Sequence, residues 1–235
     1  MGWPCAQIGS LKPLQSSDGE IAGGGDKMIG RAVTLRFVPA RPDILASKPK
    51  GGDSPEYVAF EKCDPDSVLV MESVGPLESV GGDIKFLRLK QLALNGLVTN
   101  GSVRDTDEIM DYGFGCYATG STTKQGPQRM QPWEEGGIVN LDGTVIRPGD
   151  AIIGDQDGVV CVPAAVAETV YSIAHGREQI EEIVKEELIK NPGPPGKFYP
   201  FMSGKIQVDS PLGQLLHTHG ISPKNSNQFE GSADW

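Results

Sequence analysis

The chain has 235 residues, and its 31 acidic against 21 basic residues give a formal charge of −10 at pH 7. This surplus of negative charge argues against a nucleic-acid partner and against an anionic membrane surface. No apolar run approaches the roughly 20 residues that a membrane-spanning helix needs, and the length suffices for one domain with a sizeable core.

Cysteine spacing and the first residues bear on the cellular compartment. The cysteines are scattered and form no C-x-x-C pair: Cys5, Cys63, Cys116 and Cys161. Such spacing is typical of reduced thiols rather than of a disulfide framework. The N-terminus lacks a basic segment followed by an apolar one, so we expect no secretory signal and a cytoplasmic location.

The first part of the chain is predicted to contain an arm, a strand and a loop. Residues 1–27 contain Gly23-Gly24-Gly25 and show little periodicity, which indicates an irregular N-terminal arm. Apolar and polar residues alternate over 28–38, as they do in a β-strand. The stretch 41–56 is rich in proline and glycine, and we expect an irregular surface loop there.

A βαβ unit is predicted for residues 67–105. Its first strand is the short apolar run 67–71, a pattern typical of a strand buried on both faces. After a glycine-containing loop, Asp83 stands where a residue would cap a helix over 84–95, and Gly96 stands where that helix should end. The second strand covers 97–99. On this helix, one face would carry Ile84, Leu87, Gln91 and Leu94.

The two strands of this unit place charged residues at one edge of the sheet. Arg104 and Asp105 follow the second strand, 21 and 22 residues after Asp83. Consecutive strands joined by a helix are normally parallel, so the loops after both strands open at the same edge. Ligands of open α/β sheets bind outside the carboxyl ends of the strands. We therefore predict that these three residues are neighbours in a functional site.

The remaining sequence is predicted to be β-rich, then helical, then irregular. Strands over 137–162 are joined by tight turns at Asp142-Gly143 and Asp157-Gly158. A helix over 163–190 follows. Its apolar stripe comprises Val166, Val170, Ile173, Ile180, Val184 and Leu188. Residues 191–235 are rich in proline, glycine and serine and are predicted to be a tail that wraps a neighbour or stays mobile.

Several short motifs follow one another between Met28 and Leu188. They are Gly82-Asp83, Gly96-Leu97-Val98, Gly101-Ser102-Val103-Arg104-Asp105, Pro148-Gly149-Asp150, the run from Asp155 to Pro163, and Arg177-Glu178. In this order they resemble the RraA-like family, and the ordered succession is far more specific than any single motif. That family includes the class II, divalent-metal-dependent 4-hydroxy-4-methyl-2-oxoglutarate aldolases, which also decarboxylate oxaloacetate.

The resemblance implies a fold and an assembly. The fold is an α/β protein, a swivelling α/β/β sandwich over residues 28–190, here with extended, irregular N- and C-terminal arms. The assembly is a homo-oligomer, a trimer or a hexamer, with sites at subunit interfaces. The chain departs from the family in two ways: no Ser-Asp-Ala-Leu type helical segment precedes Met28, and the C-terminal tail is longer than in the simplest members.

The resemblance also assigns roles around the predicted site. Asp105 is implied to be the direct ligand of a Mg²⁺ or Mn²⁺ ion, and Asp83 to hold a metal-bound water as a catalytic residue. Arg104 is implied to bind a small 2-oxo acid, and the backbone amides of Ile84 and Lys85 to receive a substrate carboxylate. These residue types suit the chemistry, because hard cations prefer oxygen ligands and keep several waters.

A glutamate from the helix over 163–190 completes the implied site by reaching a neighbouring subunit. The shared register places Glu181 there, with Glu178 and Glu182 as close alternatives. Retro-aldol cleavage needs a base for the hydroxyl proton, whereas decarboxylation does not. Loss of Glu181 should therefore harm aldol cleavage more than decarboxylation.

The leading hypothesis is a metal-dependent lyase that cleaves or decarboxylates a small 2-oxo dicarboxylic acid through a metal-stabilised enolate. One alternative is a family fold recruited to another reaction on a larger keto- or hydroxy-acid metabolite. Another is a non-catalytic regulator that binds proteins.

Each site residue also has a purely structural interpretation. Asp83 is a good helix N-cap without any metal, and Arg104-Asp105 could form a solvated ion pair in a turn. Glu181 lies in a run of glutamates that suits an exposed helix face. Lys124 could reach a substrate or simply be exposed, and we favour exposure.

Overall fold

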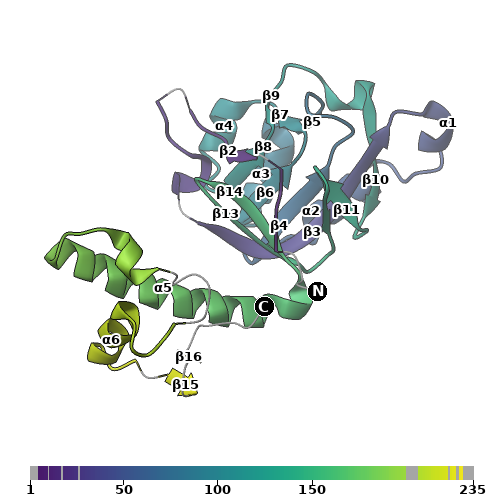
Figure 1. The fold of residues 1–235 in the computed structure, drawn as a ribbon. Coiled ribbons are helices and arrows are strands. Elements are labelled where there is room, and N and C mark those ends of the chain that lie inside the picture. Colours follow the sequence, from purple (N-terminus) through teal and green to yellow (C-terminus); the bar gives the residue numbers. More distant parts are fainter. Residues whose placement is uncertain are drawn as a thin grey trace. The chain divides into compact units, whose positions relative to one another are not determined.

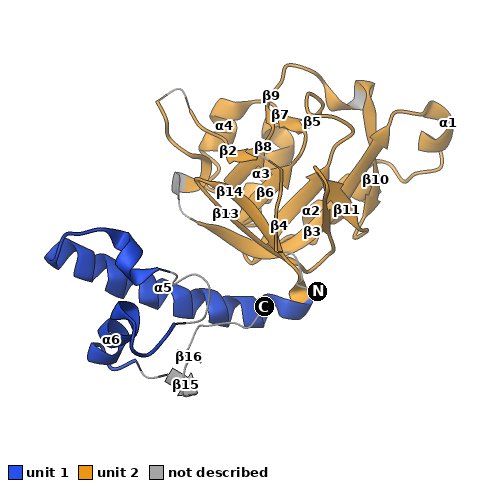
Figure 2. Cartoon of the chain, viewed as in Figure 1, with its two compact units in different colours: residues 1–2, 165–235 blue, residues 3–164 orange. Residues whose placement is uncertain are grey.

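The computed structural model describes residues 5–9, 11–16, 18–25, 27–199, 206–221, 223–225 and 228–229. The chain divides into two compact units, coloured separately in Figure 2. The first unit covers residues 3–164, and the second covers residues 165–235 together with residues 1–2. The predicted division was an arm over 1–27, a domain over 28–190 and a tail over 191–235, so the compact units meet at a different place in the sequence.

Parallel strands form the centre of the first unit (Figure 1). Strand β3 (Met28–Pro39) pairs with β4 (Ser67–Glu72), β4 pairs with β6 (Gly96–Thr99), and β6 pairs with β8 (Gly115–Ala118), all in parallel. The predicted strands over 28–38, 67–71 and 97–99 are confirmed. Their parallel order places the loops after β4, β6 and β8 at one edge of the sheet.

Antiparallel strands extend this sheet on both sides. Strands β13 (Ala151–Asp155) and β14 (Gly158–Val162) continue it beyond the start of β3, and β10 (Met130–Glu135) pairs with the end of β3. The predicted N-terminal arm supplies β1 (Ala6–Gln7) against β14 and β2 (Lys12–Pro13) against β8. Part of the arm is therefore tied to the sheet by backbone hydrogen bonds.

Two smaller β-structures complete the first unit. Short parallel strands β5 (Ser79–Gly81), β7 (Ser102–Val103) and β9 (Gly120–Ser121) form a separate sheet. Strands β11 (Val139–Leu141) and β12 (Thr144–Ile146) form a hairpin. Its turn has φ of 51° at Asp142 and 91° at Gly143, the conformation that favours Asn-Gly and Asp-Gly pairs, so the predicted turn is confirmed.

The sheet packs a different core against each face. Along β4, Leu69 and Met71 belong to one cluster of buried residues, and Val68 and Val70 belong to another. The first cluster includes residues of helices α2 (Pro55–Glu61), α3 (Asp83–Gln91) and α4 (Thr106–Met110). The second includes residues of β13, β14 and the β11–β12 hairpin. Helices cover one face of the sheet, and the curled β13–β14 end of the same sheet and the β11–β12 hairpin cover the other, which gives the predicted α/β/β arrangement.

Helix α3 buries residues outside the face that the sequence indicated. Phe86 and Leu89 are buried, whereas Ile84 and Leu87 of the indicated face are 79% and 38% exposed. Leu94 of that face is buried, but it lies after the end of the helix. The helix also ends at Gln91, before the predicted boundary, because Ala93 adopts a left-handed conformation with φ of 55°. The spacing of apolar residues alone does not determine which side of the helix faces the sheet.

Gly96 is not the helix cap that the sequence suggested. It is the first residue of β6, and a Cβ there would lie 2.0 Å from the Met28 sulfur. The position requires glycine because two strands and a buried methionine crowd it.

The predicted irregular loop over 41–56 contains short helical segments. They are α1 (Pro42–Leu45), the 3₁₀ turn η2 (Gly51–Asp53) and the start of α2 at Pro55. Proline stands at the start of both α1 and α2, where its missing N–H costs nothing. These prolines therefore mark the starts of helices and not a segment without helices.

The second unit is built on α5 (Ala167–Lys190), which follows the 3₁₀ turn η4 (Ala164–Val166). The end predicted for this helix is confirmed. Of its predicted stripe, Ile180 and Val184 are buried. They form a small cluster with residues from the predicted tail, namely Phe198, Ile206, Leu212 and Leu216.

The predicted tail contains secondary structure of its own. It includes the 3₁₀ turn η5 (Pro195–Phe198), helix α6 (Pro211–Thr218) and the short strands β15 (Pro223–Asn225) and β16 (Gln228–Phe229). Ser210 caps α6 by accepting a hydrogen bond from the Gly213 N–H at 3.0 Å. The proline-rich composition predicted a tail without this helix, but proline is well suited to the first position of a helix and is the first residue of α6.

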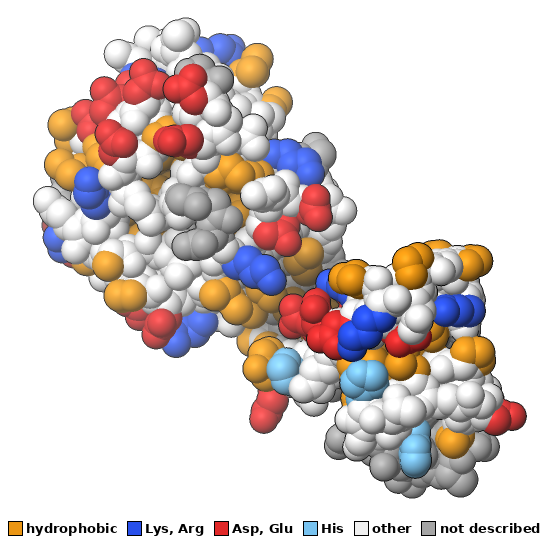
Figure 3. Space-filling view, turned by 90° about the vertical axis from the view of Figure 1, so that its left-hand side faces the viewer, with side chains coloured by type: hydrophobic (Ala, Val, Ile, Leu, Met, Phe, Trp, Pro, Cys, Tyr) orange, Lys and Arg blue, Asp and Glu red, His pale blue; other side chains and the backbone are white. Residues whose placement is uncertain are grey.

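Surface charge and free thiols agree with the composition. On the face drawn in Figure 3, acidic side chains cluster on the first unit, and basic side chains stand more singly. All the cysteines are free, and burial raises the pKa of the Cys116 thiol to about 12, which makes it a packing residue. Among the described residues, no helix is both long and apolar enough to cross a membrane.

Candidate functional site

Asp83 and Asp105 lie next to each other, as their spacing predicts. Asp83 is the first residue of α3, and Asp105 immediately precedes α4. The Asp83 backbone N–H donates a hydrogen bond to Asp105 Oδ2 at 3.1 Å. The predicted N-cap role of Asp83 is wrong, because Gly82 occupies the N-cap position. The Asp83 side chain is thereby released from capping its own helix.

Gly82 makes this contact possible. A Cβ at this position would lie 2.3 Å from Asp105 Oδ2 and 3.2 Å from Arg104 Cβ. Both distances are shorter than ordinary van der Waals contact. Glycine therefore lets the loop before α3 pass close to the loop before α4.

Asp105 has an unusual backbone conformation. Its φ of 57° and ψ of 50° are left-handed, a region that few residues other than glycine adopt. Aspartate tolerates it better than most, but such outliers persist where the surrounding structure holds them, and they gather at functional sites. The conformation turns the Asp105 carboxylate back toward α3, where it accepts the Asp83 N–H.

Arg104 is anchored through its backbone, and its guanidinium is left without a partner. Its N–H donates to the Gly81 carbonyl at 3.0 Å. Its Nε is buried and makes no hydrogen bond, and the side chain forms no ion pair within the described part of the chain. The interpretation of Arg104-Asp105 as a turn ion pair is therefore wrong. An uncommitted guanidinium is the group that pairs with carboxylates in a planar fork.

The N-terminus of α3 adds unpaired backbone donors. The first hydrogen bond of the helix runs from the Phe86 N–H to the Gly82 carbonyl at 3.0 Å. The N–H groups of Ile84 and Lys85 find no acceptor among the described residues. Two such groups and the helix dipole favour an anion. The Lys85 side chain is separately engaged, since Nζ lies 2.6 Å from Glu56 Oε1.

Tyr112 contacts Asp83, and the sequence did not predict this contact. Its hydroxyl donates a hydrogen bond to Asp83 Oδ1. This hydrogen bond, followed by burial and nearby carboxylates, raises the pKa of Tyr112 to about 12. Asp105, Ile109 and Tyr112 are spaced four and three residues apart in the sequence, with Asp105 just before α4, Ile109 within it and Tyr112 just after it. That spacing is the signal that could have pointed to Tyr112.

The two aspartates present a donor set that fits a hard cation. Asp83 and Asp105 each have one oxygen held by a hydrogen bond from the protein, and in each the other oxygen accepts none from the described residues. No cluster of three or more histidine, cysteine, aspartate or glutamate residues occurs in the described part of the chain. Mg²⁺ is commonly bound through one or two carboxylates while keeping several waters, so two carboxylates are sufficient.

The remaining candidates belong to other elements of the chain. Glu181 is half-buried on α5 in the second unit, so its proposed role at the site stays a prediction. Its alternatives differ in their contacts, since Glu182 pairs with Lys185 at 2.8 Å and Glu178 is exposed. Lys124 has a partially exposed side chain, and its Nζ lies 3.0 Å from the buried Glu78.

Comparison with known proteins gives the site a family context. The model of the RraA-like family, described as Aldolase/RraA, matches residues 7–161. Protein DlpA of Legionella pneumophila is 28% identical over 76% of this chain, which spans 27% of that protein. A protein of Halalkalibacterium halodurans named "Putative 4-hydroxy-4-methyl-2-oxoglutarate aldolase" is 28% identical, over 77% of each chain.

A solved structure agrees with both the family and the fold. Streptomyces coelicolor RraAS2, described as an unusual member of the RNase ES inhibitor RraA protein family, superposes with a TM-score of 0.65 at 26% identity. The match covers 77% of this chain and 83% of that one. The predicted resemblance and fold class are confirmed, and the chain belongs to the RraA-like family.

Proposed function

We propose that the protein is a divalent-metal-dependent lyase acting on a small 2-oxo dicarboxylic acid of the 4-hydroxy-4-methyl-2-oxoglutarate or oxaloacetate type. The proposal rests on three charged residues near Gly82 that form no ion pair among the described residues. We call Asp83, Arg104 and Asp105 the open group. Asp83 and Asp105 have carboxylate oxygens without partners, and Arg104 has a guanidinium without one, among the described residues. A relative named as an aldolase of this substrate supports the same chemistry.

The carboxylates would hold the metal ion. Asp105 would bind Mg²⁺ or Mn²⁺ directly, and Asp83 would bind one of its waters. When bound, the ion would polarise the keto group beside the bond that breaks. Tyr112 would keep the Asp83 carboxylate oriented through the hydrogen bond to Oδ1.

Two separate features would bind the anionic ends of the substrate. Arg104 supplies a planar set of donors, and the free N–H groups of Ile84 and Lys85 supply a second set at a helix N-terminus. A dicarboxylate can use both sets, whereas a monocarboxylate can use only one. This arrangement supports a small dicarboxylic acid over a neutral ligand.

A base is needed only for one of the two reactions. Aldol cleavage requires removal of the hydroxyl proton, and we propose Glu181 of a neighbouring copy in a homotrimer or homohexamer for this step. Decarboxylation releases carbon dioxide from an already ionised carboxylate and needs no such base. Both reactions otherwise use the same residues of the first unit.

Oxaloacetate turnover in the presence of Mg²⁺ or Mn²⁺, with and without EDTA, tests the proposal. We expect metal-stimulated turnover that EDTA abolishes and that Asp105→Ala reduces by about 10²-fold or more. Asp107→Ala is the matched control, because Asp107 is an exposed carboxylate in the first turn of α4. Wild-type protein that binds Mn²⁺ without turnover would favour a different substrate, and absence of both would favour a non-catalytic binding role.

A further inference from the structure

A pocket lies at the carboxyl ends of the central parallel strands. It has a volume of about 450 Å³, within the range of small-molecule sites. Ser73, Asn100 and Thr119 line it, and each is the residue that directly follows one of the strands β4, β6 and β8. Open α/β sheets bind ligands at this edge. None of the residues proposed for the lyase site lines this pocket.

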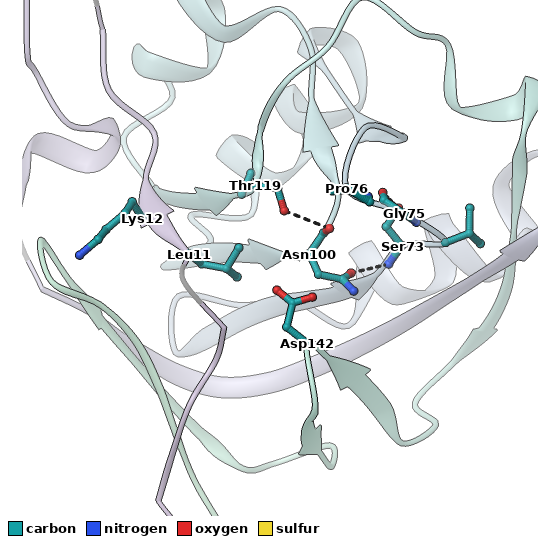
Figure 4. Close-up of a pocket in the computed structure, with 10 residues that line it drawn as sticks. Leu11, Lys12, Ser73, Gly75, Pro76, Asn100, Thr119 and Asp142 are labelled. Carbon is teal, nitrogen blue, oxygen red and sulfur yellow. Dashed lines mark hydrogen bonds between the residues drawn. The ribbon is translucent and has the colours of Figure 1, made fainter.

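Hydrogen bonds hold both the side chain and the backbone of Asn100 at the pocket (Figure 4). The side-chain Oδ1 accepts the Ser73 backbone N–H at 2.8 Å, and the backbone carbonyl oxygen accepts the Thr119 hydroxyl at 3.0 Å. Because Oδ1 must face a donor, the orientation of the amide is determined. The Nδ2 group is therefore a donor, and it has no acceptor among the described residues.

Asp142 supplies the complementary acceptor. It comes from the turn of the β11–β12 hairpin, and Figure 4 shows its carboxylate directed toward the same space as the Asn100 side chain. Its carboxylate has no hydrogen bond or ion pair within the described residues. Lys12 does not neutralise it, because Lys12 Nζ donates to the Asp157 carbonyl at 2.5 Å.

The paired donor and acceptor restrict the ligand chemistry. A carboxylate ligand could accept from Asn100 but would be repelled by Asp142, and an ammonium could donate to Asp142 but offers nothing to Asn100. A hydroxyl group both donates and accepts, so neighbouring hydroxyls satisfy both side chains at once. Leu11, Pro76 and Ala118 add apolar surface for the carbon skeleton of such a ligand.

We propose that this pocket binds a small, uncharged ligand with neighbouring hydroxyl groups, that is, a polyol or monosaccharide. The ligand would donate to Asp142 and accept from Asn100 Nδ2. The proposal does not rest on the lyase function, because the two sites share no proposed residue. One chain would then carry an anion-binding site beside Arg104 and a neutral-ligand site beside Asn100.

Saturation-transfer NMR on the full chain tests the proposal with D-glucose, D-mannose and myo-inositol as probes. We expect at least one probe to bind with a dissociation constant below about 50 mM. Acetate and methylammonium serve as charged comparison ligands, and we expect neither to compete with the bound polyol. Failure of all three polyols, or displacement by either charged ligand, overturns the proposal.

Two variants connect the binding to the pocket. Asp142→Asn keeps the shape and suits a turn position with positive φ, and we expect at least tenfold weaker polyol binding. Asn100→Asp keeps the oxygen that accepts the Ser73 N–H but removes the donor, with the same expected loss. Asp157→Asn is the matched control in the neighbouring β13–β14 turn and should bind like the wild type. Unchanged binding in Asp142→Asn overturns the proposal.

Discussion

Charged side chains of the first unit fall into two groups: some form an ion pair with another residue of the chain, and others do not. Glu56 and Glu78 are buried, and each has a lysine partner in the fold, although the second oxygen of Glu78, Oε2, has no hydrogen-bond partner among the described residues. Lys85 Nζ lies 2.6 Å from Glu56, and Lys124 Nζ lies 3.0 Å from Glu78. A buried carboxylate without a partner is costly, so these pairs are what a stable fold requires.

Asp83, Arg104 and Asp105 show the opposite behaviour. Backbone and phenol hydrogen bonds hold them in place, yet none forms an ion pair with another described residue. Arg104 even has a buried Nε without an acceptor. Oriented but unpaired charges are the physical basis of the ligand site that we propose here.

Gly82→Ala should have the largest effect on the open group. The new methyl group would press on the Asp105 carboxylate and on Arg104, so both must move. We expect Mn²⁺ binding and oxaloacetate turnover to fall by about 10²-fold or more, because small misplacements of reacting groups have effects of this size. Gly120→Ala is the control, because a Cβ at Gly120 meets nothing within 4 Å. Equal activity of the two variants would contradict the proposed site.

Lys85→Met tests the contribution of the Lys85–Glu56 ion pair to stability. It removes the partner of Glu56, whose side chain is 6% exposed, and keeps the backbone amide. We expect the free energy of unfolding to fall by about 3 kcal/mol, the low end for breaking a buried pair, because Lys85 itself is partly exposed. Chemical denaturation measures the change. The double variant Lys85→Met with Glu56→Met should recover most of the loss, and a single variant as stable as the wild type would remove the distinction between the groups.

Glu181→Gln separates the two proposed reactions. Glu181 forms no ion pair within the described residues, whereas Glu182 pairs with Lys185. We expect cleavage of 4-hydroxy-4-methyl-2-oxoglutarate to fall by about 10²-fold, in line with loss of a general base, and oxaloacetate decarboxylation to change little. Glu182→Gln is the control. Parallel loss of both activities in Glu181→Gln would exclude a role as the aldol base.

The sequence predicted the strands and the neighbourhood of the site better than it predicted the helix between them. Strands such as β4 are buried on both faces, so their apolar runs are unambiguous. The sequence indicated the wrong face of α3, because Ile84 and Leu87 fit a helical spacing of apolar residues but are exposed. Their exposure depends on where Gly82 and Asp105 fix the first turn, which is a tertiary contact.

From the sequence, the unpaired charged residues of the candidate site were also easier to predict than the buried ion pairs. Arg104 and Asp105 stand out because they follow a strand at the edge where ligands bind. The partner of Lys85 could not be foreseen, because Glu56 lies 29 residues away on α2. Long-range pairs of this kind carry no local pattern, and a single sequence does not reveal them.

Tyr112→Phe should have the smallest effect on the comparison and is the most specific test of how the open group is oriented. The variant removes the hydrogen bond to Asp83 Oδ1 and leaves the ring, which packs against Phe114 with centroids 6.3 Å apart. We expect about tenfold weaker Mn²⁺ binding, the lower end for loss of a group that orients a metal ligand.

Mn²⁺ titration followed by electron paramagnetic resonance, together with kcat and KM for oxaloacetate, distinguishes orientation from general loosening of the fold. Loss of orientation should lower metal affinity and kcat while leaving KM at saturating Mn²⁺ nearly unchanged, because the proposed substrate contacts of Arg104 and the α3 amides are separate from Asp83. Tyr57→Phe is the control, since Tyr57 is partly buried on α2 and makes no hydrogen bond through its hydroxyl among the described residues. Wild-type Mn²⁺ affinity in Tyr112→Phe would show that Asp83 is held in place without the phenol, and that its carboxylate is fixed by α3 alone.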